Sequence, residues 1–194
     1  MKKLIGPKKI KTSIFISGTG SNLKKLINFS KKKNSPINIV LVVSDNKNAK
    51  GLNFSKKKKI DTKIYQYTSR ILSENKILKD LNKKKAKLIC LAGFMKILSK
   101  NFIRKFNGKI LNIHPSLLPK YKGLNTHKRA IKNNEIFSGC TVHLVNSKLD
   151  SGKIILQKKI RISKKDNYKT LGKKILKHEH FLYPRAIKKI ISNY

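Results

Sequence analysis

The sequence predicts an α/β fold: a single domain with a mostly parallel β-sheet flanked by helices and with an antiparallel hairpin at one edge. Short runs of β-branched and apolar residues alternate with Lys-rich segments of helix length, which is the pattern of βαβ units. Neither a repeat of fixed period nor a Gly-, Ser- or Pro-rich linker divides the 194 residues, and 39% of them are hydrophobic. A chain of this length can bury one sizeable core. We therefore expect residues 1–194 to form one domain, with residues 1–9 as a loosely ordered basic extension.

The individual elements follow from the local pattern. Apolar, β-branched runs predict strands at 10–16, 37–43, 62–67, 87–92 and 109–113. Segments of helix length predict helices at 21–30, 49–58, 70–84, 99–106 and 169–190. Two further strands, at 141–145 and 153–160, lie close together in the sequence and predict the edge hairpin.

Charge is the most conspicuous feature of the composition. The chain carries 48 Lys and Arg residues against 8 Asp and Glu, a formal net charge of +40, and only five of the cations are arginine. Nucleic-acid sites favour arginine, which contacts phosphate bidentately and stacks on bases. The lysines are spread over nearly every expected helix and loop, which is typical of a solvated surface. We expect no specific nucleic-acid partner, and a Lys-rich nucleic-acid binder is the alternative from a different class.

Nothing in the sequence indicates a membrane or an oxidising compartment. No apolar run approaches the roughly 18 residues of a membrane span, and residues 1–9 lack the uninterrupted apolar stretch of a signal peptide. Cys90 and Cys140 lie in apolar stretches and form no Cys-x-x-Cys pair, so we expect buried, reduced thiols. The chain is expected to be cytoplasmic and to have no membrane partner.

The segment after the first strand is a candidate anion site, because ligands of open parallel sheets bind beyond the carboxyl ends of the strands. It reads Ser17-Gly18-Thr19-Gly20-Ser21-Asn22-Leu23, with a helix expected from Ser21 or Asn22. Glycines permit a tight turn and the amides of a helix start attract an anion, so the segment either holds a phosphate or is only a capped turn. Leu23 occupies the third glycine position of a dinucleotide fingerprint, which disfavours NAD.

Two later strands also end in candidate segments. Asn112 and His114 project to one face of an extended strand. An amide beside an imidazole suits acyl transfer, because one group can stabilise an oxyanion while the other moves protons; a satisfied structural pair is the alternative. The strand at 87–92 leads into the apolar segment 91–98, which is either core or the wall of a pocket for a flat ring.

With only eight acidic residues, the place of each is informative. Asp150 lies in the connection of the hairpin, and Glu179 lies on the last helix. The other six are expected in loops or on exposed helix faces: Asp45, Asp61, Glu74, Asp80, Glu135 and Asp166. His178-Glu179-His180 predicts no metal site, because residues two apart on a helix point about 200° apart. No metal is expected.

Four segments in a fixed order carry a family resemblance: 17–23, 93–98, 112–119 and 149–152. Together they closely resemble the phosphoribosylglycinamide formyltransferases, the folate-dependent glycinamide ribonucleotide transformylases of purine biosynthesis. The resemblance extends from about Lys11 to the last helix. Two related families share the Asn-x-His motif. Methionyl-tRNA formyltransferase carries a further C-terminal domain, and formyltetrahydrofolate hydrolase has an extra N-terminal domain and a second histidine where Pro115 stands.

The resemblance implies a formyltransferase-type, Rossmann-like domain that moves the formyl group of 10-formyltetrahydrofolate to glycinamide ribonucleotide, without a metal, as a monomer or homodimer. It implies catalytic roles for Asn112, His114 and Asp150. Ribonucleotide contacts are implied for Gly20, Ser21, Asn22 and Glu179. Folate contacts are implied for Arg70, Met95, Lys96, Ile97, Leu98, Asn112, Asn146, Ser147, Lys148, Leu149 and Asp150. Leu176 departs from the family pattern, because some members have a polar substrate contact there.

The resemblance also leads to an expectation about charge. A histidine has a reference pKa of about 6.5. A carboxylate at Asp150 close to His114 would favour the imidazolium and raise that pKa. We therefore expect a charged His114 that stabilises the oxyanion with Asn112, while Asp150 relays the proton of the substrate amine to N10 of the folate.

Overall fold

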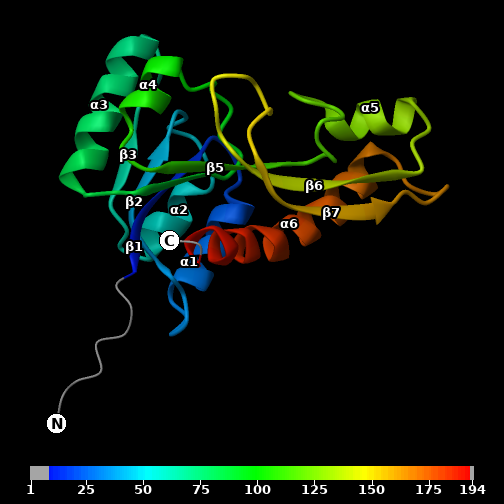
Figure 1. Cartoon of the computed structure of the whole chain (residues 1–194), viewed down its shortest axis with the longest axis horizontal. Coiled ribbons are helices and arrows are strands. Elements are labelled where there is room, and N and C mark those ends of the chain that lie inside the picture. Colours follow the sequence, from blue (N-terminus) through cyan, green and yellow to red (C-terminus); the bar gives the residue numbers. More distant parts are fainter. Residues whose placement is uncertain (1–8, 193–194) are drawn as a thin grey trace.

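The structure, a computed structural model, describes residues 9–192 and contains a seven-stranded sheet in the order β3-β2-β1-β4-β5-β6-β7. Its strands are β1 (Ile10–Ile16), β2 (Ile37–Ser44), β3 (Thr62–Ile64), β4 (Leu88–Leu91), β5 (Lys109–His114), β6 (Phe137–Leu144) and β7 (Ile154–Arg161). The pairs from β3 through β5 are parallel, and β5·β6 and β6·β7 are antiparallel (Figure 1). The predicted fold class and the edge hairpin are therefore confirmed. Of the expected extension at residues 1–9, only Lys9 lies within the described residues.

The helices are α1 (Ser21–Ser30), α2 (Leu52–Lys57), α3 (Arg70–Lys83), α4 (Lys100–Lys105), α5 (Thr126–Lys132) and α6 (Tyr168–Ile191). All except α5 lie where the sequence predicts a helix. Asn125, the residue before α5, has a left-handed backbone (φ 58°) and makes no side-chain cap. Asn is a residue typical of a helix start, but the seven residues of α5 are too few to show a clear helical periodicity.

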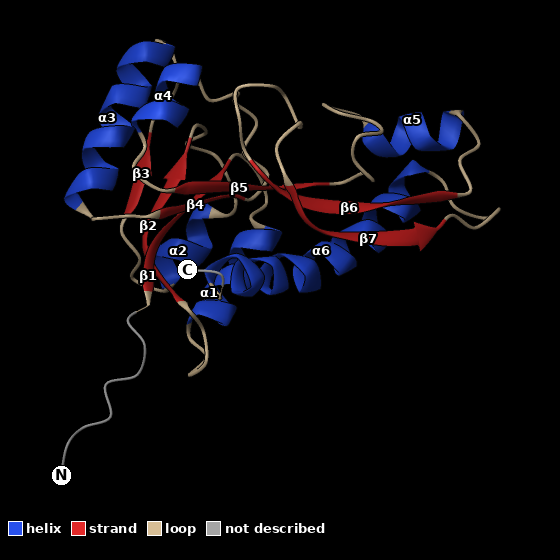
Figure 2. Cartoon of the chain, viewed as in Figure 1, coloured by secondary structure: helices blue, strands red, loops and turns tan. Residues whose placement is uncertain are grey.

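Two apolar layers hold the helices against the sheet. Along β1, Ile14 and Ile16 face one side and Phe15 faces the other, because successive side chains of a strand alternate. Ile14 and Ile16 share a cluster with side chains of α1 and α6, whereas Phe15 shares one with side chains of α3 and α4. Figure 2 shows these two pairs of helices on opposite sides of the sheet. Burying one such side chain stabilises the fold by about 1.5–3 kcal/mol.

Tyr183 ties α6 to the two central strands that end at the site. Its side chain is fully buried, and its hydroxyl lies 3.0 Å from the carbonyl oxygen of Leu91 and 3.1 Å from that of Leu111. Leu91 ends β4, and Leu111 lies on β5 opposite Cys90, the residue before Leu91. The tyrosine therefore fixes the position of α6 relative to the carboxyl ends of both strands.

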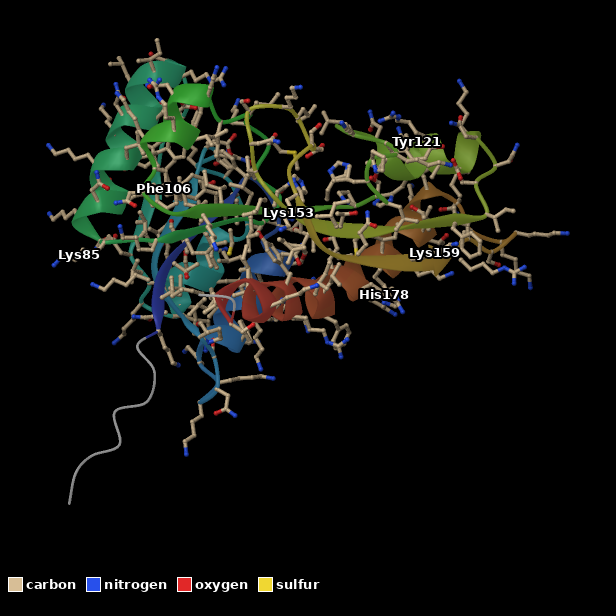
Figure 3. The ribbon with its side chains drawn as sticks, viewed as in Figure 1. Lys85, Phe106, Tyr121, Lys153, Lys159 and His178 are labelled. Atoms are coloured by element: carbon tan, nitrogen blue, oxygen red, sulfur yellow. The ribbon has the colours of Figure 1, made fainter. Side chains whose placement is uncertain are left out.

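The lysines form a coat on the outside of the fold. No lysine among residues 9–192 is buried. In Figure 3, Lys85 and Lys159 stand toward opposite ends of the molecule, so the positive charge is not confined to one end. Cys90 and Cys140 are free and buried, as predicted. Within the described part of the chain, no helix has the length and apolar character that crossing a membrane requires.

We predict that Tyr183→Phe lowers the free energy of unfolding by about 1 kcal/mol, the net worth of a typical buried hydrogen bond. Urea denaturation measures the change. Tyr168→Phe is the matched control at the start of the same helix, where the ring is 42% exposed, and it should have a much smaller effect. Equal losses from the two variants would contradict the anchoring role.

Candidate active site

A cleft of about 740 Å³ opens beyond the carboxyl ends of β1, β4 and β5. Its walls are residues 17–22, 91–98, 112–115, 123–127, 143 and 145–150, with Leu176 and Glu179 from α6. Every site residue predicted from the sequence lines this cleft except Arg70. Arg70 begins α3, where its Nε lies 3.4 Å from Oε1 of Glu74 and its side chain is half exposed.

One end of the cleft is formed by the start of α1. Gly20 precedes the helix with φ 72°, and no side chain caps the helix start. A Cβ at Gly20 would lie 2.5 Å from Cα of Gly51, so only glycine lets the two loops approach this closely. The uncapped amides of α1 carry the positive end of the helix dipole, which is suited to an anion.

Asn22 and Glu179 form a buried polar pair between α1 and α6. Asn22 Nδ2 donates to Glu179 Oε2 at 2.7 Å, and the two residues are 7% and 6% exposed. Burial raises the pKa of Glu179, and the bond from Asn22 offsets only part of that. Asn22 Oδ1 is buried without a partner. The pair therefore offers an acceptor that a ligand can satisfy.

Asp150 is the centre of a second polar cluster in the cleft. It has φ 45°, a left-handed conformation that Asp tolerates better than most residues. Its Oδ2 accepts from the amide of Gly123 at 2.9 Å and lies 3.4 Å from Nδ1 of His114. Its Oδ1 lies 3.4 Å from Nδ2 of Asn112 and 3.6 Å from Nε2 of His143. Burial favours the neutral acid, but contacts with His143, Gly123 and His114 outweigh it and lower the pKa of Asp150, so the carboxylate is ionised at neutral pH.

For the pKa of His114, in contrast to that of Asp150, the effect of burial is larger than the effect of the contacts. Burial lowers the pKa of His114 below its ordinary 6.5, and the opposing effects of the Tyr121 carbonyl and Asp150 do not restore it. The expected rise in this pKa is therefore wrong for the ligand-free protein, because the cost of burying the charged ring exceeds the attraction of the carboxylate. Nε2 lies 2.8 Å from the carbonyl oxygen of Tyr121, so the neutral ring carries its proton there. Nδ1 then faces Asp150 as an unprotonated base.

His143 is a member of the cluster that sequence reasoning missed. It lies opposite Asn112 in the antiparallel pair β5·β6 and is 2% exposed. Its Nδ1 lies 2.8 Å from the carbonyl oxygen of Leu144, and its Nε2 lies 3.2 Å from Asn112 Nδ2. Only the register of β5 against β6 brings the two together. The one available signal was the place of His143 on a predicted strand, two residues after Thr141, which puts both side chains on the same face of that strand.

The third wall is largely apolar. Leu91, Ala92 and Leu98 are buried beneath it, whereas Met95 and Ile97 are about 63% and 62% exposed toward the opening. The loop 145–150 faces this segment across the cleft. Such a wall suits a flat ring system more than a charged group.

One acid expected on an exposed helix face is buried instead, and one expected in a loop has a side chain with little exposure. Glu74 is 4% exposed, and it accepts from the backbone amide of Ser99 at 2.8 Å and from the Ser99 hydroxyl. The expectation of an exposed helix face is therefore wrong for Glu74, which holds the start of α4. Asp45 lies in a loop as expected, but its side chain is only 8% exposed. Residues 9–192 contain no cluster of three or more His, Cys, Asp or Glu side chains that could hold a metal ion.

The formyl transferase family matches residues 10–187. The chain belongs to this family. A solved phosphoribosylglycinamide formyltransferase from Brucella melitensis has a TM-score of 0.89 and 42% identity, with 94% of this chain and 96% of that one covered. The enzyme of the same name from Haemophilus influenzae is 39% identical over 92% of this chain and 85% of its own length.

Some formyl transferase relatives are much longer. The trifunctional purine biosynthetic protein adenosine-3 of Gallus gallus is 42% identical over 187 residues, which are 95% of this chain and 19% of that protein. The human protein of that name is 39% identical, and 19% of its length is covered. The chain thus spans about a fifth of these relatives.

We predict that Asp150→Asn lowers the pKa of His114 further, because it removes the carboxylate that favours the imidazolium. An NMR titration of the histidine ring signals measures this pKa. Asp61→Asn removes the same charge from a carboxylate that pairs with Lys84 at 2.7 Å, and it should leave the pKa of His114 in place. A higher pKa in Asp150→Asn would contradict this account of the pair.

Proposed function

We propose that the chain transfers the formyl group of 10-formyltetrahydrofolate to the amino group of glycinamide ribonucleotide, which gives formylglycinamide ribonucleotide and tetrahydrofolate. The observation that carries the proposal is the convergence of Asn112, His114 and Asp150 between an uncapped helix start and an apolar wall. The names of the relatives from Brucella melitensis and Haemophilus influenzae support the same activity.

The two ends of the cleft suit the two halves of this reaction. In the proposed complex, the phosphate of the ribonucleotide lies against the amides of Gly20, Ser21 and Asn22, and Glu179 accepts from the sugar or glycinamide. The folate ring lies against residues 95–98 and 146–150. The buried acceptor Asn22 Oδ1 supports this placement, because it lacks a donor and the ribonucleotide carries several.

The folate supplies a formyl group bound to N10. The substrate amine bonds to the formyl carbon, negative charge develops on the formyl oxygen, and the bond to N10 then breaks. Asn112 donates to that oxygen. Its amide contacts with His143 and Asp150 are 3.2 and 3.4 Å long, longer than an ordinary hydrogen bond of about 2.9–3.0 Å, so the amide is free to turn toward the substrate. One such donor is worth about 2.7–4 kcal/mol of transition-state stabilisation.

Proton transfer is the task of the His114–Asp150 pair. The amine loses a proton as it attacks, and N10 must gain one as it leaves. The unprotonated Nδ1 of His114 and the ionised Asp150 can take the first proton together and return it to N10. An imidazolium formed in this way has an acceptor at each nitrogen, the Tyr121 carbonyl and the Asp150 carboxylate. A neutral ring in the ligand-free protein therefore suits the first step.

We further propose that the folate is a co-substrate used without a metal, and that the partners are these two small anions and not nucleic acid. The lysine coat supports steering of both, because a positive field concentrates anionic substrates. A cytoplasmic monomer or homodimer completes the proposal.

The direct test mixes purified protein, 10-formyltetrahydrofolate and glycinamide ribonucleotide and follows loss of the formyl group. Loss that needs the ribonucleotide supports the proposal. Loss with methionyl-tRNA, or with no acceptor, would point to one of the two related families.

Asp150→Asn should reduce turnover by orders of magnitude while ribonucleotide binding stays nearly intact, and near-normal turnover would exclude the proton role. Asp61→Asn is the charge-matched control.

We predict that Asn22→Ala acts mainly on the ribonucleotide. It removes the unpartnered acceptor and the donor to Glu179, so the KM for the ribonucleotide should rise about tenfold or more, the effect of losing roughly 1.4 kcal/mol of binding. Steady-state kinetics with each substrate varied in turn measures this. An unchanged KM with collapsed turnover would refute the assignment of Asn22.

A further inference from the structure

Three loops of the cleft meet at one serine hydroxyl. Ser17 follows β1, Asp45 follows β2, and Met95 follows β4. Ser17 Oγ donates to Oδ1 of Asp45 and accepts from the backbone amide of Met95 at 2.8 Å. This junction joins residues 17–22, which begin the segment assigned to phosphate, to residues 95–98, which are assigned to folate.

The chemistry of the three groups fixes the direction of both bonds. An ionised carboxylate only accepts, and a hydroxyl has a single hydrogen to give. Ser17 therefore gives its hydrogen to Asp45 and keeps its lone pairs for Met95. Hydrogen bonds to a charged group are also stronger than neutral ones. Asp45 is the side chain that orients the junction.

The surroundings keep Asp45 in place. Its side chain is 8% exposed, and Lys96 Nζ lies 4.0 Å from its Oδ2. The next residue, Asn46, donates from Nδ2 to the carbonyl oxygen of Ser17 at 3.1 Å. The loop after β2 thus forms hydrogen bonds with both the side chain and the backbone of Ser17.

The two walls depend on this junction to different degrees. The phosphate-side loop has its own supports, because Gly51 donates to the carbonyl of Gly18 at 3.0 Å and packs directly on Gly20. The segment from Gly93 to Leu98 belongs to no helix or strand. Its start is held by the Ser17 amide on the Gly93 carbonyl and by the Phe94 ring against Phe15. The bond from Met95 to Ser17 holds the part that follows, where Met95 and Ile97 are largely exposed. Loss of the junction should loosen the folate-side wall more than the phosphate side.

We propose that Asp45 is a positioning residue that acts through Ser17 to hold the Met95–Leu98 wall in the place that folate needs. The proposal rests on the proposed function for the identity of the ligand. It makes Asp45 and Ser17 determinants of folate affinity although the structure places Asp45 outside the cleft lining.

The test compares Asp45→Ala, Ser17→Ala and their double variant with Asp61→Ala as a surface control. Calorimetry measures the dissociation constants for tetrahydrofolate and for glycinamide ribonucleotide. Each single variant should weaken tetrahydrofolate binding about tenfold and change ribonucleotide binding by less than about twofold. The double variant should be no weaker than the singles, because both act through one bond. Asp45→Asn keeps an acceptor for Ser17 and should recover most of the affinity.

Hydrogen exchange across residues 93–98 gives a readout that needs no ligand. Asp45→Ala should speed exchange there, and Asp61→Ala should not. Unchanged exchange, or an equal loss of affinity for both ligands, would overturn the proposal. If the wild-type protein binds no tetrahydrofolate but Asp45→Ala still loosens 93–98, the proposed function fails and the positioning role of Asp45 stands.

Discussion

The ionised carboxylate of Asp150 is the interaction on which the candidate site depends. Its two oxygens contact groups from three separate parts of the chain: Asn112 and His114 on β5, His143 near the end of β6, and the amide of Gly123. The strands β5 and β6 are already paired in the sheet, and the carboxylate joins the loop at Gly123 to them. A neutral side chain of the same shape would accept fewer bonds and would leave His114 without its partner. The antiparallel hairpin matters chiefly because the connection between its strands β6 and β7 carries Asp150.

A wider rule about charge follows from the scarcity of acids. The positive charge is spread as a lysine coat around the fold, whereas Asp45, Glu74, Asp150 and Glu179 are withdrawn from solvent. Each of the four accepts hydrogen bonds that join segments distant in sequence. A buried carboxylate is costly unless it is bonded in this way. In this chain the few carboxylates organise the interior of the site, and under the proposed function the many cations attract the anionic substrates.

Sequence patterns predicted the layers of this fold better than its contacts. The strand at 10–16 and the helix at 21–30 are observed at the predicted residues, because apolar periodicity and Gly20 mark them locally. Helix α5 was missed, since its seven residues are too few to show a clear helical periodicity. His143 and the buried face of Glu74 were missed because strand register and helix docking decide them. The sign of the pKa shift at His114 was wrong for the same reason: the opposing carboxylate was visible in the sequence, but the depth of burial was not.

Three buried polar groups of the cleft link the stability of the protein to its proposed function. Asn22 Oδ1 has no partner, Glu179 is buried with a raised pKa, and Nδ1 of His114 faces a carboxylate without a proton between them. The unpaired Asn22 Oδ1 costs the ligand-free protein about 1–3 kcal/mol, and burial disfavours the charged forms of Glu179 and His114. The well-packed layers around β1 and Tyr183 tolerate that cost. Under the proposed function, the ribonucleotide supplies a donor to Asn22 Oδ1 and a proton to the His114–Asp150 pair. The free-energy cost that these groups impose on the ligand-free protein is then relieved on binding, which favours binding and the first proton transfer.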